Sequence, residues 1–190
     1  MFRAKRRTVV TVTAVLAVLL AGALAVTLLT QGNGNAKTDG AVEYQPGHRP
    51  LAPDISATSL TGAAIKLSSY RGKTVVLNFW GSWCPPCRAE APTLAVLAQQ
   101  YNSKGVAFVG DDVGDTPSNA LAFTRSAGIT YPSISDPSYL VVARFSEVAP
   151  VSDTPTTVVI DKTGHVAGMV LGEVSYGQMT TLLRNAAVTQ

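Results

Sequence analysis

The stretch VVLNFWGSWCPPC, residues 75–87, decides the fold of this chain. Its first six residues are almost all apolar, and a run of that length and composition is typical of a strand buried on both faces. From Pro86 to about residue 100 the apolar residues follow helical spacing, which predicts a helix that ends before Gly105. The two cysteines of the chain, Cys84 and Cys87, therefore stand where a buried strand gives way to a helix.

The position of the cysteine pair favours thiol chemistry. A helix N-terminus has unpaired N–H groups and about half a positive charge, which stabilise a thiolate, and thiols there have pKa values lowered to roughly 3.5 to 7.5. Pro86 suits the first helical position because it lacks an N–H, and it disfavours helical angles at Pro85. We therefore expect Cys84 to lie exposed just outside the helix as the attacking thiolate, with Cys87 buried as the resolving thiol.

Other roles for the two cysteines fit less well. Structural zinc normally needs four ligands, and the chain adds only His48 and His165. A structural disulfide across so short a loop would constrain little of the unfolded chain. We therefore expect no bound metal and no cofactor. A metal-carrying or adhesive module remains an alternative, and it would bind copper or zinc without reducing the disulfides of insulin.

Strands and helices alternate around the central stretch. Residues 55–60 and 63–67 predict an N-terminal β-hairpin. The pattern further predicts strands at 106–110, 132–135, 156–160 and 166–171 and helices at 117–127, 139–145 and 178–187. The turn at 161–164 makes the last two strands antiparallel. The predicted fold class is α/β, with a mixed central sheet flanked by helices. Three aspartates are expected in a solvated loop after the strand predicted at 106–110: Asp111, Asp112 and Asp115.

Residues 1–30 precede this domain and predict a membrane anchor or signal segment. Four basic residues within the first seven are followed by an uncharged apolar run at residues 8–29. Such a run is long enough to span a bilayer of roughly 30 Å, and the charge pattern places the rest of the chain on the outer side. We expect a single-pass membrane protein with an extracytoplasmic domain, or a secreted protein if residues 1–25 are cleaved.

Composition separates a linker from the domain. Residues 31–50 are rich in Gly, Asn and Pro, and predict a flexible linker. Residues 51–190 have a common size for one domain with a sizeable core. The formal net charge is +3, but without the four N-terminal basic residues 11 Lys and Arg face 12 Asp and Glu. The exported part is therefore almost neutral, and nothing indicates a nucleic-acid partner.

Two motifs resemble the thioredoxin superfamily: FWGSWCPPCRAEAP at residues 79–92 and TPTTVVID at residues 154–161. Within that superfamily, residues 51–190 are similar to the membrane-anchored TlpA/ResA-like thiol-disulfide oxidoreductases. The resemblance implies a thioredoxin-like fold in which Cys84 and Cys87 are the redox pair. It also implies a cis peptide bond before Pro155, of the one type that adopts cis at modest cost.

The resemblance further implies a substrate site next to the cysteines. The backbone of Thr154 is expected to pair with the substrate as an added strand. Candidate substrate contacts are Trp83, Pro85, Pro86, Thr154 and Pro155.

Glu90 is the candidate acid of the site. Cytoplasmic thioredoxins have a buried aspartate where this chain has Asn78, and TlpA/ResA-like proteins are similar to this chain in both positions. Glu90 lies three residues after Cys87, on the same helix face, where it is a candidate general acid and base. A lone carboxylate is more often a solvated surface residue, so that alternative remains open.

We expect an extracytoplasmic thiol-disulfide oxidoreductase that acts as a reductant of exported proteins. The resemblance implies apocytochrome c as a substrate and a CcdA- or DsbD-type membrane protein as electron donor. A disulfide oxidant is one alternative. A thiol peroxidase of related fold is another, although its Pro-x-x-x-Thr-x-x-Cys setting is absent here.

Overall fold

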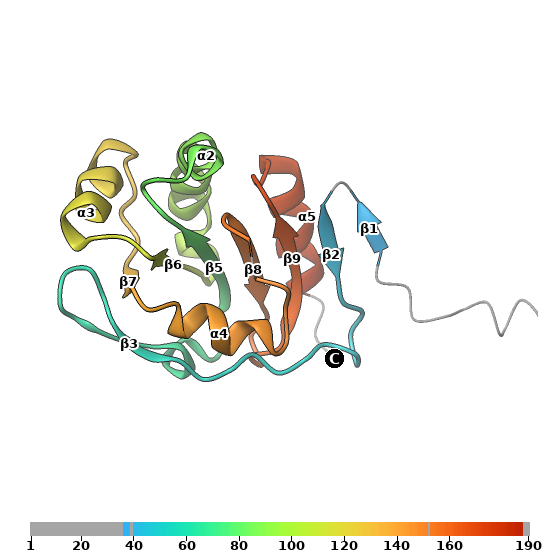
Figure 1. Ribbon diagram of the computed structural model, residues 1–190. Coiled ribbons are helices and arrows are strands. Elements are labelled where there is room, and N and C mark those ends of the chain that lie inside the picture. Colours follow the sequence, from blue (N-terminus) through green and yellow to red (C-terminus); the bar gives the residue numbers. More distant parts are fainter. Residues whose placement is uncertain (1–35, 39, 152, 188–190) are drawn as a thin grey trace, which may run out of the picture. The chain divides into compact units, whose positions relative to one another are not determined.

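The computed structural model describes residues 36–38, 40–151 and 153–187, which fold around a mixed seven-stranded sheet (Figure 1). The strand order is β1-β2-β9-β8-β5-β6-β7. These strands are β1 (Ala36–Thr38), β2 (Ala41–Glu43), β5 (Thr74–Trp80), β6 (Val106–Val113), β7 (Ser133–Asp136), β8 (Thr156–Ile160) and β9 (Val166–Leu171). The helices are α2 (Pro85–Tyr101), α3 (Pro117–Ser126), α4 (Leu140–Ser146) and α5 (Tyr176–Ala187), with short 3₁₀ turns at Leu67–Tyr70 and Asn102–Lys104.

Strand directions confirm the predicted mixed sheet. β5 runs parallel to β6 and antiparallel to β8, and β6 runs parallel to β7. β8 and β9 are antiparallel, as the turn between them predicts. The predicted N-terminal hairpin is a separate two-stranded sheet of β3 (Ser56–Thr58) and β4 (Ala64–Lys66). The α/β thioredoxin-like fold is therefore confirmed.

The hydrophobic core lies on both faces of the sheet. All seven residues of β5 are buried, as expected for a strand covered on both sides. One face packs against α4 and the hairpin, and the other packs against α2 and α5. Figure 1 shows α2, α3 and α5 on one side of the sheet and α4 with the hairpin on the other. β5 is thus held in the centre of the molecule, and its end fixes where α2 begins.

The predicted boundary between linker and domain, at residue 51, is wrong for most of residues 31–50. β1 and β2 extend the sheet, and β2 pairs with β9. Arg49 is only 5% exposed, and its guanidinium contacts the Asp161 carboxylate at 2.9 Å. Composition did not predict this structure for two reasons. A strand that adds to a sheet edge is held by its backbone, whatever its side chains, and a buried arginine is tolerated when it is paired.

The predicted anchor or signal segment, residues 1–30, lies outside the described residues. In the part of the chain that the structure describes, none of the helices combines the length and hydrophobicity that a membrane span requires.

Asp111 and Asp112 lie inside β6, so the predicted solvated loop is wrong for them. β6 continues past Gly110 because β7 pairs with it there. Both carboxyls are buried and have no hydrogen-bond partner among the described residues. Burial, followed by the charge of Asp136, raises the pKa of Asp111 well above its usual range. Burial, followed by the charge of Asp115, raises the pKa of Asp112 to about 7.

Arg49→Ala is expected to destabilise the oxidised protein by about 3 kcal/mol, because it leaves Asp161 buried without its cation. Urea unfolding of the native protein and the variant measures this difference. The control is Arg125→Ala on α3, where an exposed side chain is removed and the expected change is within about 0.5 kcal/mol. If both variants lose equally little, residues 40–50 are a linker after all.

Candidate active site

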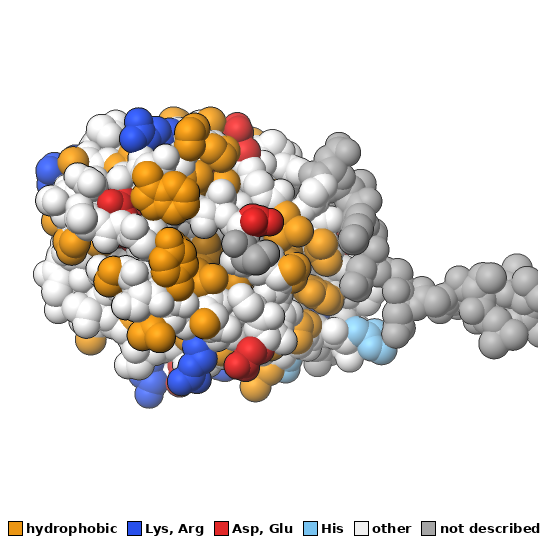
Figure 2. Space-filling view, viewed as in Figure 1, with side chains coloured by type: hydrophobic (Ala, Val, Ile, Leu, Met, Phe, Trp, Pro, Cys, Tyr) orange, Lys and Arg blue, Asp and Glu red, His pale blue; other side chains and the backbone are white. Residues whose placement is uncertain are grey.

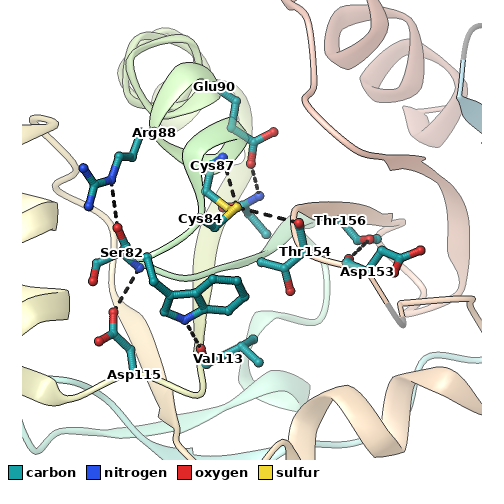
Figure 3. The surroundings of a disulfide bond; sticks show 12 residues. Ser82, Cys84, Cys87, Arg88, Glu90, Val113, Asp115, Asp153, Thr154 and Thr156 are labelled. Carbon is teal, nitrogen blue, oxygen red and sulfur yellow. Dashed lines mark hydrogen bonds between the residues drawn. A yellow bond between two sulfur atoms is a disulfide. The ribbon is translucent and has the colours of Figure 1, made fainter.

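The end of β5 and the start of α2 bring the two cysteines together (Figure 3). β5 ends at Trp80, a short connection follows, and α2 begins at Pro85. Cys84 and Cys87 form a disulfide with an S–S distance of 2.08 Å and a Cα–Cα distance of 5.3 Å. The structure therefore describes the oxidised form of the pair.

Cys84 is the N-cap of α2. Its backbone is extended (φ −90°, ψ 113°), and its Sγ accepts a hydrogen bond from the Cys87 backbone N–H at 3.2 Å. Pro85 and Pro86 follow, so the helix begins one residue earlier than predicted, with two residues that need no partner for an N–H. In the reduced protein the same N–H and the helix dipole favour a thiolate on Cys84.

The prediction that Cys84 is exposed is wrong for the oxidised form. Cys84 is 2% exposed and Cys87 is 1% exposed, and only the burial of Cys87 was predicted. The pair packs against Trp80, and the Cys84 Sγ lies 3.6 Å from the Thr154 carbonyl oxygen. The sulfur is bonded to Cys87 on one side and faces the Thr154 carbonyl on another. A partner must therefore fit closely around the Thr154 loop to reach the sulfur.

The connection before Cys84 is held by side chains to which sequence analysis assigned no role. The Ser82 backbone N–H donates to the Asp115 carboxylate at 2.9 Å, and the Arg88 Nε donates to the Ser82 carbonyl at 2.8 Å. Burial raises the pKa of Asp115, but hydrogen bonds from Ser82 and Thr116 outweigh it, and the pKa is lowered. Asp115 is therefore ionised at neutral pH. No local pattern indicates this contact, because only the sheet brings Ser82 and Asp115 together.

The predicted cis peptide bond between Thr154 and Pro155 is confirmed. The Asp153 carbonyl accepts a hydrogen bond from the Thr156 hydroxyl at 2.6 Å, which ties the loop to the start of β8. Figure 3 shows the Thr154 carbonyl directed at the Cys84 sulfur. The two motifs that carry the family resemblance therefore meet in space.

Glu90 is buried, at 1% exposure, so the surface alternative is excluded. Asn78 donates to one carboxyl oxygen and the Val174 backbone N–H donates to the other, both at 2.8 Å. Burial raises the pKa of Glu90 from 4.5 to about 7, and the two hydrogen bonds offset it only in part. Near pH 7 the carboxyl can both accept and release a proton. Asn78, missed as a site residue, positions this acid from β5.

The other predicted substrate contacts border the disulfide. Trp83 is 52% exposed, and its Nε1 donates to the Val113 carbonyl at 3.1 Å. Pro85 and Pro86 are also exposed, whereas Pro155 is buried beneath the loop. Figure 2 shows hydrophobic side chains gathered on the face that carries the start of α2 and the end of β6. That these residues contact a substrate stays a prediction.

Fold and site together define the class of protein. A disulfide at the N-terminus of a helix, beside a cis-proline loop on a mixed sheet, undergoes thiol-disulfide exchange. The part of the chain that the structure describes contains no group of three or more His, Cys, Asp or Glu side chains placed to hold a metal ion. The chain is a thioredoxin-like thiol-disulfide oxidoreductase.

Known proteins agree with this assignment. The sequence profile of the AhpC/TSA family matches residues 49–169, and the chain belongs to this family. It is 38% identical over 121 residues to the thiol-disulfide oxidoreductase ResA of Geobacillus kaustophilus, covering 64% of this chain and 67% of the relative. It is 33% identical over 133 residues to ResA of Bacillus thuringiensis, covering 70% of this chain and 75% of the relative.

Two solved structures are similar to the whole domain. A secreted thiol-disulfide isomerase from Corynebacterium glutamicum superimposes with a TM-score of 0.73 at 31% identity, over 82% of this chain and 96% of that one. A DsbF homologue from Corynebacterium diphtheriae superimposes with a TM-score of 0.70 at 33% identity, over 80% and 99%.

Glu90→Gln is expected to weaken the pH dependence of stability. Since the folded state raises the pKa of Glu90 from 4.5 to about 7, the stability that this carboxyl contributes is complete below about pH 4.5 and is lost as pH rises through 7. Between about pH 4.5 and pH 8, the unfolding free energy of the native protein should fall by up to about 3 kcal/mol more than that of the variant. Urea unfolding of both oxidised proteins across this range measures the difference, and equal falls would contradict it.

Proposed function

We propose that this protein is an extracytoplasmic reductant of disulfides in exported proteins. The observation that carries the proposal is the buried Cys84–Cys87 disulfide at the N-terminus of α2, with the Glu90 carboxyl held on the same helix. Cys84 and Cys87 exchange electrons, and Glu90 moves a proton. Trp83, Pro85, Pro86, Thr154 and Pro155 contact the substrate.

The reaction balances without a cofactor. The Cys84 thiolate attacks one sulfur of the substrate disulfide, and the other sulfur leaves as a thiolate that takes up a proton. Cys87 then loses its proton and attacks the Cys84 sulfur, which breaks the mixed disulfide and releases the second substrate thiolate. Two electrons pass from the cysteine pair to the substrate. A membrane dithiol donor then reduces the Cys84–Cys87 disulfide by the reverse sequence.

Glu90 acts on the buried thiol. Cys87 is 1% exposed, so its proton needs an acceptor inside the protein. Glu90 lies one turn further along α2, and its pKa of about 7 allows it to take the proton at neutral pH. The two hydrogen bonds from Asn78 and Val174 keep the carboxyl in place during this step.

Burial supports the reductive direction. A reduced pair at neutral pH carries thiolate charge, and in the oxidised form both cysteines are almost fully buried. Desolvation disfavours that charge, and an ionised Glu90 on the same helix disfavours it further. Both effects favour the disulfide, so the reduced pair gives up its electrons readily. The helix dipole acts in the opposite direction, because it stabilises the thiolate.

The proposed location and partners follow from the N-terminal sequence and the relatives. Residues 8–29 form the apolar run that we propose as an anchor, and the C. glutamicum neighbour is described as secreted. By the resemblance to TlpA/ResA-like proteins, we include apocytochrome c among the substrates. The same resemblance supports a CcdA- or DsbD-type donor.

The redox potential tests the direction of transfer. Equilibrating residues 36–190 with glutathione buffers, followed by thiol alkylation, should give a potential nearer to about −270 mV, as in thioredoxin, than to about −120 mV, as in DsbA. A value near that of DsbA would make the protein an oxidant. Consumption of hydrogen peroxide faster than reduction of insulin would instead indicate a peroxidase.

Trapping separates the roles of the two cysteines. Reduced Cys87→Ser should accumulate a mixed disulfide between Cys84 and a disulfide-containing peptide, because the resolving thiol is missing. Cys84→Ser should accumulate less than about a tenth as much, because Cys87 is buried. Intact mass spectrometry under denaturing conditions counts the adducts. Equal trapping by both variants would refute the assignment of Cys84 as the attacking residue.

A further inference from the structure

Tyr139, in the turn between β7 and α4, has an unusual backbone conformation. Among the described residues it is the single non-glycine residue with positive φ (φ 60°, ψ 25°). For a bulky residue this conformation is unfavourable, and such residues cluster at functional sites. The Tyr139 side chain is 49% exposed, so burial in the core is not the reason for it.

Capping of α4 does not require a tyrosine at this position either. Tyr139 is the N-cap residue of α4, but its side chain makes no capping hydrogen bond. The Asp136 carboxylate accepts the N–H groups of Leu140 at 2.7 Å and Val141 at 2.9 Å instead. The helix N-terminus is therefore satisfied from β7, and the tyrosine ring is free for another task.

The Tyr139 ring lies against the end of β6. A Cβ atom at Gly114 would lie 2.2 Å from the Tyr139 hydroxyl oxygen, so only a glycine leaves room for the phenol. The preceding residue, Val113, accepts the hydrogen bond from the Trp83 indole at 3.1 Å. Two half-exposed aromatic side chains, Trp83 and Tyr139, thus lie against the consecutive residues Val113 and Gly114 at the end of β6. One of them directly precedes Cys84 in the chain.

We propose that Tyr139 and Trp83 together bind an aromatic or large aliphatic side chain next to the reacting cysteine of an extended substrate segment. The proposal rests on the proposed function, since the occupant is the polypeptide around a substrate disulfide. Cys84 is 2% exposed in the oxidised form and directly follows Trp83, so substrate residues that flank the reacting cysteine have to lie against this rim. An apolar substrate side chain then covers the faces of the Trp83 and Tyr139 rings, whereas a polar side chain leaves water between itself and the rings.

The experiment compares two peptides that each contain one disulfide and differ only in having Phe or Ser beside the reacting cysteine. Second-order rate constants are measured with the reduced protein and divided by the rate for hydroxyethyl disulfide, so that changes in thiol reactivity cancel. We expect the native protein to prefer the Phe peptide by about threefold to tenfold. Tyr139→Asn should lose most of this preference, because Asn accepts positive φ but has no ring. Tyr139→Phe should retain it.

The control is Tyr176→Asn, which removes a similarly exposed tyrosine from α5 and should keep the native preference. Tyr139→Gly serves as a second variant if Tyr139→Asn does not fold. A native protein without preference, or a Tyr139→Asn variant with the native preference, overturns the proposal. A native protein that reduces neither peptide nor hydroxyethyl disulfide overturns the proposed function itself.

Discussion

The hydrogen bond from the Cys87 backbone N–H to the Cys84 sulfur is the contact on which the site depends. It exists because β5 is paired on both edges and buried on both faces, so its last residue, Trp80, has a fixed position. The short connection to α2 then leaves Cys84 as the N-cap. The strand determines where the helix begins, and the helix determines which sulfur meets its positive end. The chemistry of the pair is therefore a consequence of sheet packing.

The acidic group of the site and the amide that donates to it come from two different elements, a helix and a strand. Asn78 on β5 donates to Glu90 on α2, so the amide occupies the strand and the carboxyl occupies the helix. Two donors at 2.8 Å make burial of the carboxyl tolerable, yet burial still raises its pKa to about 7. A third donor would push the pKa lower and trap the anion, whereas fewer would keep the proton on Glu90. This balance is what suits the carboxyl to exchange a proton with a buried thiol near neutral pH.

Features set by local sequence were predictable, and features set by distant partners were not. The β5–α2 junction and the β8–β9 pair follow from periodicity and turn residues within a short window. Arg49 escaped prediction because its partner, Asp161, is 112 residues away. The burial of Cys84 escaped it for the same reason, since the covering Thr154 belongs to another motif. Glu90 was located from its helix position, but its burial depends on Val174, which lies in the connection before α5.

The C-terminal end of β6 supports the surface that meets a partner. Residues 113–115 hold Trp83 and the active-site connection by hydrogen bonds and leave space for Tyr139. They reach this position because β6 extends through Val113, where β7 still pairs with it. The extension places Asp111 and Asp112 in the interior, where both carboxyls lack partners among the described residues and have raised pKa values. Such local conflicts are expected at functional sites, where stability is given up for geometry. The two acids are buried because they belong to the part of β6 that leads to residues 113–115, and these residues hold the active-site connection.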